Sequence, residues 1–375
     1  MAVLELSNED SLRLNVLVMN VEAVRIDERS MAVYGLSASG EARVQLNPTG
    51  RSDQYLRAVR EFLSSYALGS PGGYPVHLNR WTRMGQARDA NLATLLMLGE
   101  PEAIAAVVCA PGLTEELARR AWWVDPCSEN ARRMLEREVV VQGEMGRALA
   151  DHLIEHLPFE TEPHVIIDTV RLVLQPGLIG AEVRQRLWEK GAAQSAYRIG
   201  FLQAEPDSLP QPVPARADLE SLRAALASFT AGQHTLAALL LRTLDGPGQA
   251  FIATCEQLLN KLSSQDSVVA LLNVLSRYFA ALRKPGEPIQ DVATILDEAA
   301  NALDAEPVAR ELLAALPELR PELLAMYTLA HMDEAVVTPV FARSSASGSL
   351  MRRKIEPVIR TVLAQIAALR RSAHG

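Results

Sequence analysis

The chain has few cysteines, aromatic residues and lysines. Its three cysteines are an odd number, widely spaced over 375 residues, so no disulfide framework is implied. Aromatic residues make up 5% of the chain, and four lysines stand against 33 arginines. No apolar run reaches the roughly 20 residues of a membrane span. The first five residues carry no basic side chain, so we expect no signal peptide and a soluble, cytoplasmic protein.

Several signatures of catalysis and nucleotide binding are also missing. No G-x-G-x-x-G follows a predicted strand, and the Pro-Gly-Gly of residues 71–73 lacks the Gly-Lys-Ser/Thr end of a Walker A loop. Neither G-x-S-x-G nor C-x-x-C occurs. The net charge of −8 argues against nucleic-acid binding over the whole surface. We therefore expect no cofactor and no bound metal, and the residues identify no small-molecule substrate.

The composition that remains is that of a helical protein. Ala, Leu, Arg and Glu dominate, all good helix formers. Hydrophobic residues make up 49% of the chain, enough for a large core, and a chain of 375 residues exceeds one ordinary domain. We therefore predict a mainly α fold with two or three domains.

A near-repeat is the most distinctive pattern. Residues 111–122 (PGLTEELARRAW) return 65 positions later, with one insertion, as residues 176–188 (PGLIGAEVRQRLW). Each copy follows an apolar helical run, so each predicts a helix, a Pro-Gly turn and a second helix whose Trp closes the buried face. Stacked units of this kind form HEAT-like helical arrays (α-solenoids), which usually bind partners.

The N-terminal region predicts a small α+β module. Ser7 can cap a short helix from Asn8, with Asp10 placed for a capping box. A helical pattern of apolar residues later covers residues 51–68. Between them, three β-like stretches separated by turn residues predict an antiparallel β-meander: residues 21–27, 31–36 and 41–46.

The expected architecture is a β-meander module, a helical array and a second all-α domain. The clearest boundary is a segment with four prolines in fourteen residues, which favours an extended spacer. A serine-rich joint precedes a basic terminal helix. The predicted order is an N-terminal α+β module in residues 1–88, a helical array in 89–203, a Pro-rich linker in 204–217 and a C-terminal helical domain in 218–375.

His152, Glu155 and His156 match H-x-x-E-H, the inverted zinc motif. On a helix the two histidines share one face and Glu155 can polarise a water, so a zinc-dependent hydrolase is one alternative function. A third ligand is missing from any recognisable position. The competing interpretation is a solvated helix end, where the helix dipole favours cationic histidine.

Cys127 supports a second alternative, a cysteine-based sulfur carrier. It follows Asp125-Pro126 and precedes a predicted helix start, where the positive helix end can lower a thiol pKa. The competing interpretation is an inert loop cysteine. Cys109 and Cys255 lie in apolar helical runs and are interpreted as small core residues.

Two basic segments are candidate interaction sites. Residues 351–375 carry six cations against one acid, and their apolar residues form one face, so this helix can dock on a partner or pack on its own chain. An aromatic-basic patch follows the earlier Gly/Pro loop, and Trp and Arg are enriched at interfaces. The candidate interaction residues are Arg80, Trp81, Arg83, Arg352, Arg353, Lys354 and Arg360.

Seven stretches together resemble a known family. They are residues 34–36, 41–51, 69–76, 80–85, 109–114, 118–123 and 157–163. They are similar to DsrS, a family of cytoplasmic accessory proteins from the gene cluster of the reverse-acting dissimilatory sulfite reductase in sulfur-oxidising bacteria. The resemblance covers residues 1 to about 210 and is less distinct beyond them. It implies a supporting or regulatory part in the oxidation of stored sulfur, and it assigns no catalytic residue.

We therefore expect a non-enzymatic accessory or regulatory binding protein of bacterial sulfur oxidation. It would act through helical surfaces that hold a protein of the sulfur-oxidation machinery or an RNA transcript. A transcript regulator predicts binding that weakens steeply with salt.

Overall fold

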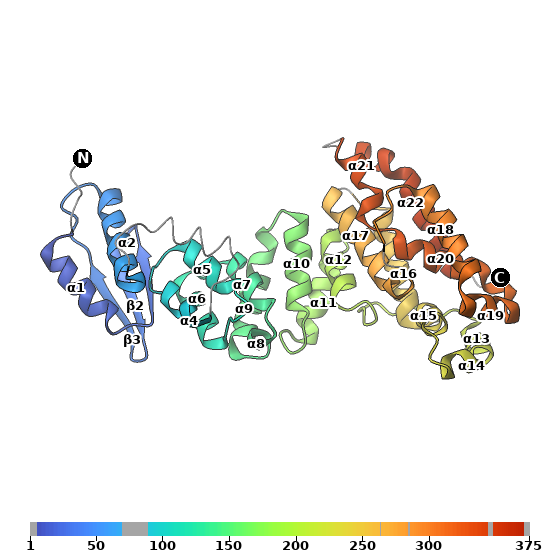
Figure 1. Ribbon diagram of the computed structural model, residues 1–375, viewed down its shortest axis with the longest axis horizontal. Helices are drawn as coiled ribbons and strands as arrows, with labels where there is room; N and C mark the ends of the chain where they lie inside the picture. The colour runs from blue at the N-terminus through green and yellow to red at the C-terminus, as the bar shows by residue number, and fades with distance from the viewer. Residues whose placement is uncertain (1–5, 70–88, 263, 284–285, 344–347, 371–375) are drawn as a thin grey trace. The chain divides into compact units, whose positions relative to one another are not determined.

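The chain forms two compact units, shown within the ribbon of Figure 1. The computed structural model describes residues 6–69, 89–262, 264–283, 286–343 and 348–370. Unit 1 comprises residues 1–158 and 175–179, and unit 2 comprises residues 159–174 and 180–375. Both are rich in helices, and unit 1 also contains a small antiparallel sheet. The predicted fold class is confirmed.

The sheet of unit 1 is a three-stranded antiparallel meander in the order β1-β2-β3. Its strands are β1 (Ala23–Asp27), β2 (Ala32–Ser37) and β3 (Gly40–Gln45). These bounds confirm the three predicted stretches, because the alternation of apolar and polar residues is a local signal. Apolar residues that alternate along the strands share one face, as the register Val33↔Val44 shows.

α1 (Asn8–Val18) and α2 (Ser52–Leu68) pack on that face of the sheet. Their apolar sides close a core that excludes water from the sheet, which is the main stabilising contribution to this part of the fold. The buried residues of this core are Leu14, Leu17, Val18, Val24, Val33, Val44, Leu46, Tyr55, Leu56, Val59 and Leu63.

Asp10 fixes the position of α1. As predicted, the Ser7 hydroxyl caps the helix by accepting from the Asp10 N–H at 3.1 Å. The predicted capping box is not closed, because the Ser7 N–H donates to the Tyr55 hydroxyl at 3.2 Å and not to the fully buried Asp10 carboxylate. That carboxylate accepts instead from the Asn47 N–H at 2.9 Å and from the Tyr55 hydroxyl. One carboxylate thus ties α1 to the exit of β3 and to α2.

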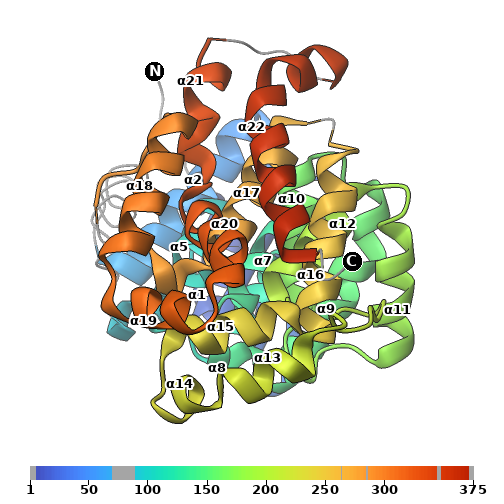
Figure 2. The ribbon, with the colours of Figure 1, turned by 90° about the vertical axis from the view of Figure 1, so that its right-hand side faces the viewer.

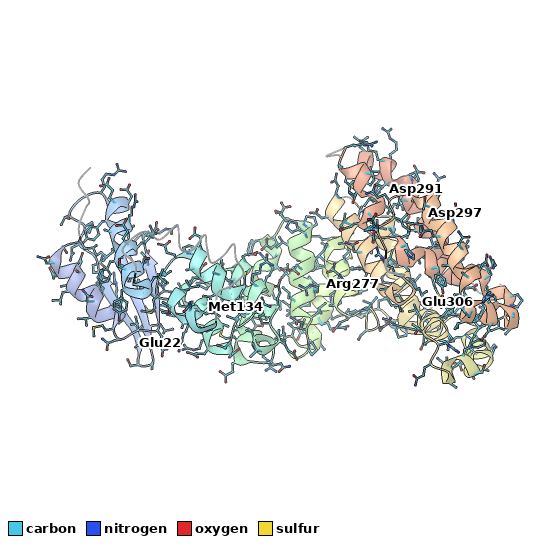
Figure 3. All side chains as sticks on the ribbon, in the orientation of Figure 1. Glu22, Met134, Arg277, Asp291, Asp297 and Glu306 are labelled. Carbon is cyan, nitrogen blue, oxygen red and sulfur yellow. The ribbon has the colours of Figure 1, made fainter. Side chains whose placement is uncertain are left out.

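The remaining helices of unit 1 continue from the sheet, since α6 contacts β1. α5 packs on α6, and α7 packs on α9. Met134 on α7, labelled in Figure 3, is fully buried. The elements are α4 (Asp89–Leu95), α5 (Pro101–Val108), α6 (Glu115–Val124), α7 (Ser128–Leu135), α8 (Glu138–Val141), α9 (Glu144–His156) and the 3₁₀ turn η1 (Leu157–Phe159), whose last residue belongs to unit 2.

Unit 2 is built from helices in the part that the structure describes. α10 packs on α12, α18 on α20 and α20 on α22. Figure 2 shows α18, α20 and α22 side by side. The elements are α10 (Pro163–Val173), α11 (Ala181–Lys190), α12 (Ser195–Ala204), α13 (Leu219–Ala225), α14 (Ala227–Ala231), α15 (Thr235–Leu244), α16 (Gly246–Leu259), α17 (Gln265–Tyr278), η2 (Ala280–Leu282), α18 (Val292–Ala305), α19 (Pro307–Ala315), η3 (Pro317–Leu319), α20 (Arg320–His331), η4 (Glu334–Val336), α21 (Thr338–Phe341) and α22 (Gly348–Arg370). None of the helices described is both long and apolar enough to cross a membrane.

Both copies of the near-repeat form a helix, a turn and a helix, as predicted. The first copy joins α5 to α6, and the second joins α10 to α11. Trp188 closes a buried face, where its ring meets Phe201 edge-on at 5.2 Å. The same prediction is wrong for Trp122, which is half-buried. Its indole packs against the His152 ring at 4.8 Å, near the surface, so the two copies are not equivalent.

The Pro-rich segment of residues 204–217 lies within unit 2 and does not divide the two units. Helices α10 to α12, which we predicted to belong to the preceding array, also belong to unit 2. Beyond the end of α12, the segment contains turns and bends and no helix or strand, and ion pairs fix it along its length. These pairs are Glu205 with Arg184, Asp207 with Arg242, and Arg216 with Glu322.

Candidate functional site

α1 carries apolar side chains on two opposite faces. One face, which includes Leu14, is buried in the core. On the other face Leu12, Val16 and Met19 are 66%, 58% and 74% exposed. Their spacing of four and three residues places them along one line on the helix. We call these three residues the α1 stripe. A contiguous exposed apolar surface of this kind marks interaction sites.

β3 is an edge strand of the sheet. The Leu46 N–H donates to the Met31 carbonyl at 2.9 Å, so these two residues form a hydrogen-bonded pair. Hydrogen-bonded and non-hydrogen-bonded pairs alternate along an antiparallel ladder. The pairs Leu36↔Glu41, Tyr34↔Arg43 and Ala32↔Gln45 are therefore non-hydrogen-bonded. In this register, the backbone N–H and C=O groups of Glu41, Arg43 and Gln45 point away from β2. Among the residues described, these groups have no hydrogen-bond partner.

α1 and β3 together enclose a groove of about 830 Å³. Leu12 and Val16 of the α1 stripe form its helical side, and Ala42 and Val44 form its strand side. Arg43 and Gln45 of β3 also contribute to the lining. Pockets that hold ligands are typically about 300 to 1,000 Å³ and mostly apolar. The groove is therefore large enough to hold a short chain segment.

On the opposite face of the sheet, cations and aromatic rings alternate. The Arg25 guanidinium lies between the rings of Tyr34 and Trp123, at 5.0 and 4.8 Å from their centroids. Glu41 accepts from Arg25 at 3.3 Å and from the Trp123 indole N–H at 3.0 Å. Arg43 extends the row over Tyr34 at 5.7 Å. This row braces β3 from the side that does not face the groove.

The basic terminal helix, α22, packs on its own chain. Its apolar face is buried, including Ile355 and Val362, and it contacts α16 and α20. Of the two interpretations of this helix, self-packing is therefore confirmed. Arg352 donates to the Leu262 carbonyl at 2.6 Å, and Arg360 pairs with Glu356 at 2.8 Å.

The cations predicted as interaction residues on α22 remain on its outer face. Arg352, Arg353, Lys354 and Arg360 are exposed. Their contact with a partner stays a prediction. The other predicted interaction residues, Arg80, Trp81 and Arg83, lie outside the described residues.

The histidines of the predicted zinc motif lie on α9 and form a ring stack. The centroids of His152 and His156 are 4.0 Å apart, and the His156 Nδ1 lies 2.9 Å from the His152 carbonyl. The His152 Nε2 lies 3.4 Å from the Ser128 hydroxyl. Burial and the neighbouring His156 lower the pKa of His152. Across the described ranges, no third metal-ligating side chain converges on this pair and Glu155, and a catalytic zinc needs three protein ligands.

Cys127 is the N-cap residue of α7, so its predicted place at a helix start is confirmed. The thiol is half-buried and lies 3.7 Å from the Asp125 carboxylate. Burial raises the pKa of this thiol, and the negative charge of Asp125 raises it further. Of the two interpretations, this environment favours the inert cysteine, because burial and the carboxylate outweigh the helix end.

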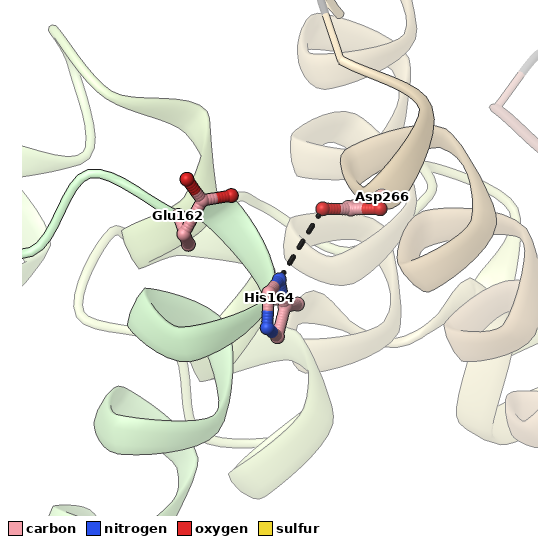
Figure 4. Close-up of side chains that lie close together, drawn as sticks. All are labelled: Glu162, His164 and Asp266. Atoms are coloured by element: carbon pink, nitrogen blue, oxygen red, sulfur yellow. Dashed lines mark hydrogen bonds and ion pairs between the residues drawn. The ribbon is translucent and has the colours of Figure 1, made fainter. Parts of the chain in front are cut away.

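Glu162, His164 and Asp266 form a cluster that sequence reasoning missed (Figure 4). Their potential ligand atoms lie within 4.8 Å of one another, and the His164 Nδ1 is 3.4 Å from Asp266. All three side chains are exposed. Glu162 is the N-cap of α10 and Asp266 is in the first turn of α17. The Glu162 and Asp266 carboxylates interact favourably with the positive N-terminal ends of α10 and α17, which explains their position without a bound ion.

Comparison of the chain with known protein families, with curated proteins and with solved structures gives no match. The α1 stripe and the β3 edge are candidate features that sequence reasoning missed. The spacing of Leu12, Val16 and Met19 was the available signal. It was not decisive, because the sequence alone does not say which apolar face of a helix is buried.

Proposed function

We propose that this chain is a non-enzymatic binding protein that holds a protein partner in the groove between α1 and β3. The observation that carries the proposal is the α1 stripe, three large exposed apolar side chains of which two, Leu12 and Val16, line a groove. Covering such a surface removes apolar area from water, which is a principal driving force for protein association.

The resemblance to DsrS over residues 1 to about 210 supports an accessory or regulatory role in bacterial sulfur oxidation. The partner is then a protein of the sulfur-oxidation machinery. The alternatives gain no support from their sites, since the pKa of Cys127 is raised and His152 stacks on His156. A catalytic thiol needs a lowered pKa and a catalytic zinc needs a third ligand.

The test is a pull-down from a sulfur-grown bacterium with the full chain as bait. The wild-type chain is compared with the double variant Leu12→Asp/Val16→Asp, whose new charges lie on exposed positions. We expect a defined set of proteins on the wild-type bait and their loss on the variant. Val139→Asp is the matched control, because Val139 is an exposed apolar residue of unit 1 on α8, away from the groove.

The proposal fails if the double variant captures the same proteins as the wild-type chain. Treatment with RNase tests the other candidate partner, an RNA transcript. If the captured material is lost on RNase treatment and not in the double variant, the partner is a transcript and the groove is not its site.

A further inference from the structure

The outer edge of β3 is not paired with another strand among the described residues. Glu41, Arg43 and Gln45 each present a backbone N–H and C=O that point outward and have no partner in the described part of the chain. Extended peptides add to such edges through main-chain hydrogen bonds, and pockets for alternate side chains give specificity. The groove, which Leu12 and Val16 of the α1 stripe line, lies along this edge.

We propose that the partner docks on β3 as an added antiparallel strand of about five residues with an apolar-acidic-apolar centre. This inference rests on the proposed function, because it names the binding mode and the partner chemistry for the same groove. The antiparallel direction continues the sheet, in which both existing pairs are antiparallel.

The two faces of the sheet set the side-chain pattern of the added strand. Residues opposite each other in an antiparallel pair point to the same face. The residues opposite Ala42 and Val44 therefore enter the groove and meet the apolar α1 stripe. The residue opposite Arg43 points to the other face.

The positive charge of Arg43, on the face of the sheet away from the groove, favours an acidic residue opposite it on the added strand. Arg43 donates to the Gln45 amide oxygen at 2.6 Å and, among the described residues, has no carboxylate partner. Glu41 already accepts from Arg25 and Trp123. We therefore expect a carboxylate opposite Arg43, apolar residues opposite Ala42 and Val44, and neutral polar residues opposite Glu41 and Gln45.

A second copy of this chain is a poorer occupant. A two-fold pairing of β3 centred on Arg43 would place Arg43 opposite its own copy, and like charges directly opposite are destabilising. A shifted register would pair Arg43 with Glu41 of the other copy. That carboxylate already accepts two hydrogen bonds from Arg25 and Trp123.

The test is fluorescence anisotropy of a labelled peptide with the core Thr-Val-Glu-Val-Thr, added to the full chain. In the proposed pairing, the N–H of the central Glu faces β3 and the N–H groups of the two Val face away. N-methylation of the central Glu should weaken binding at least tenfold. N-methylation of the two Val, the matched control, should leave it within about twofold.

Variants of the protein test the groove and the charge pair. Val16→Asp should weaken peptide binding at least tenfold, and Val139→Asp should leave it unchanged. Arg43→Glu should weaken binding about threefold to fivefold, the range of a cross-strand charge pair, and should prefer a Thr-Val-Lys-Val-Thr peptide. That reversal of preference identifies the pairing and does not depend on a general loss of structure.

Three results would overturn the added strand. They are no binding of the Thr-Val-Glu-Val-Thr peptide to folded protein, equal effects of Glu and Val methylation, or a dimer in sedimentation that Val16→Asp dissociates. The last result would make a second copy the occupant. Loss of capture by Leu12→Asp/Val16→Asp in the pull-down would still support the proposed function, so the two failures are distinguishable.

Discussion

Arg216 shows how a single charged residue organises unit 2. Its side chain is 2% exposed, and it donates to Glu322 at 2.8 Å and to Asp218 at 2.7 Å. The Glu322 side chain is 4% exposed. Two buried opposite charges compensate each other's lost hydration, and removing one leaves the other uncompensated. Arg216 thereby holds the end of the Pro-rich segment against α20.

We expect Arg216→Ala to lower the free energy of unfolding by about 3 to 5 kcal/mol, because Glu322 would remain buried without its partner. Urea denaturation measures the loss. The double variant Arg216→Met/Glu322→Leu should recover most of it, since the two most deeply buried charges are removed together and Asp218, whose side chain is 17% exposed, keeps contact with water. Arg360→Ala, which removes an exposed ion pair, should cost less than about 1 kcal/mol. Equal losses for Arg216→Ala and Arg360→Ala would contradict this account.

Cys127 provides a test of pH dependence at the residue scale. Because burial and Asp125 raise the thiol pKa, its reactive thiolate fraction at neutral pH is smaller than that of an ordinary cysteine. Cys109, which we interpreted as a core residue, is exposed, because it lies at the C-cap of α5, so it is replaced by serine in this test. In the Cys109→Ser background, the alkylation rate should rise with pH about a midpoint above the usual value of about 8.5.

Asp125→Asn should move the alkylation midpoint of Cys127 to lower pH, because it removes the negative charge that disfavours the thiolate. Cys255 is fully buried and should not contribute to the signal. A wild-type midpoint at or below the ordinary value would show that the helix end dominates and would revive the sulfur-carrier alternative.

At the scale of elements, the crossing of α10 and α12 depends on a glycine. A Cβ on Gly200 would stand 2.6 Å from the Val170 Cβ and 2.9 Å from the Ile167 carbonyl oxygen. Val170 and Ile167 are themselves buried, so neither can move away freely. The absence of a side chain on α12 therefore sets how closely the two helices approach.

We expect Gly200→Ala to destabilise the protein by up to about 2 kcal/mol. Alanine gains about 1 kcal/mol in helix propensity, but the overlap with α10 costs about 1 to 3 kcal/mol. Thermal unfolding followed by circular dichroism measures the balance. Gly286→Ala is the control, because a Cβ there meets no atom within 4 Å. Stabilisation by Gly200→Ala would show that α12 can move away from α10.

The elements that the sequence predicted well are those with local signals. The strands followed from alternation, the start of α1 from Ser7, and the apolar face of α22 from its helical period. The candidate site combines α1 with β3, and which apolar face of α1 is buried depends on the contacts of Leu14 with distant strands. His164 and Asp266 meet across 102 positions of sequence, a pairing that no spacing predicts.

At the scale of the whole molecule, the division into units differs from the predicted one. Proline content predicted a spacer at residues 204–217, but composition does not reveal that Arg216 and other charges fix this segment to unit 2. α10 and α12 pack on α17, which lies on the far side of the segment in sequence. Long-range packing thus overrides the local character of the Pro-rich stretch.

The division into units predicts how fragments behave. A fragment of residues 159–375 retains α10 to α12 together with α17, and we expect it to unfold cooperatively. A fragment of residues 204–375 lacks those helices and exposes the apolar residues of α17 that they cover, so it should bind the dye ANS. Chemical denaturation and ANS fluorescence of both fragments measure the difference. Cooperative unfolding of 204–375 without dye binding would restore the boundary that proline content predicted.

The turn at residues 175–179 belongs to unit 1, although the residues on both sides of it belong to unit 2. The polypeptide therefore passes from one unit to the other three times. Neither unit corresponds to one uninterrupted stretch of a gene. Exchanging either whole unit by recombination therefore requires several simultaneous breakpoints. The two units are therefore expected to be inherited together.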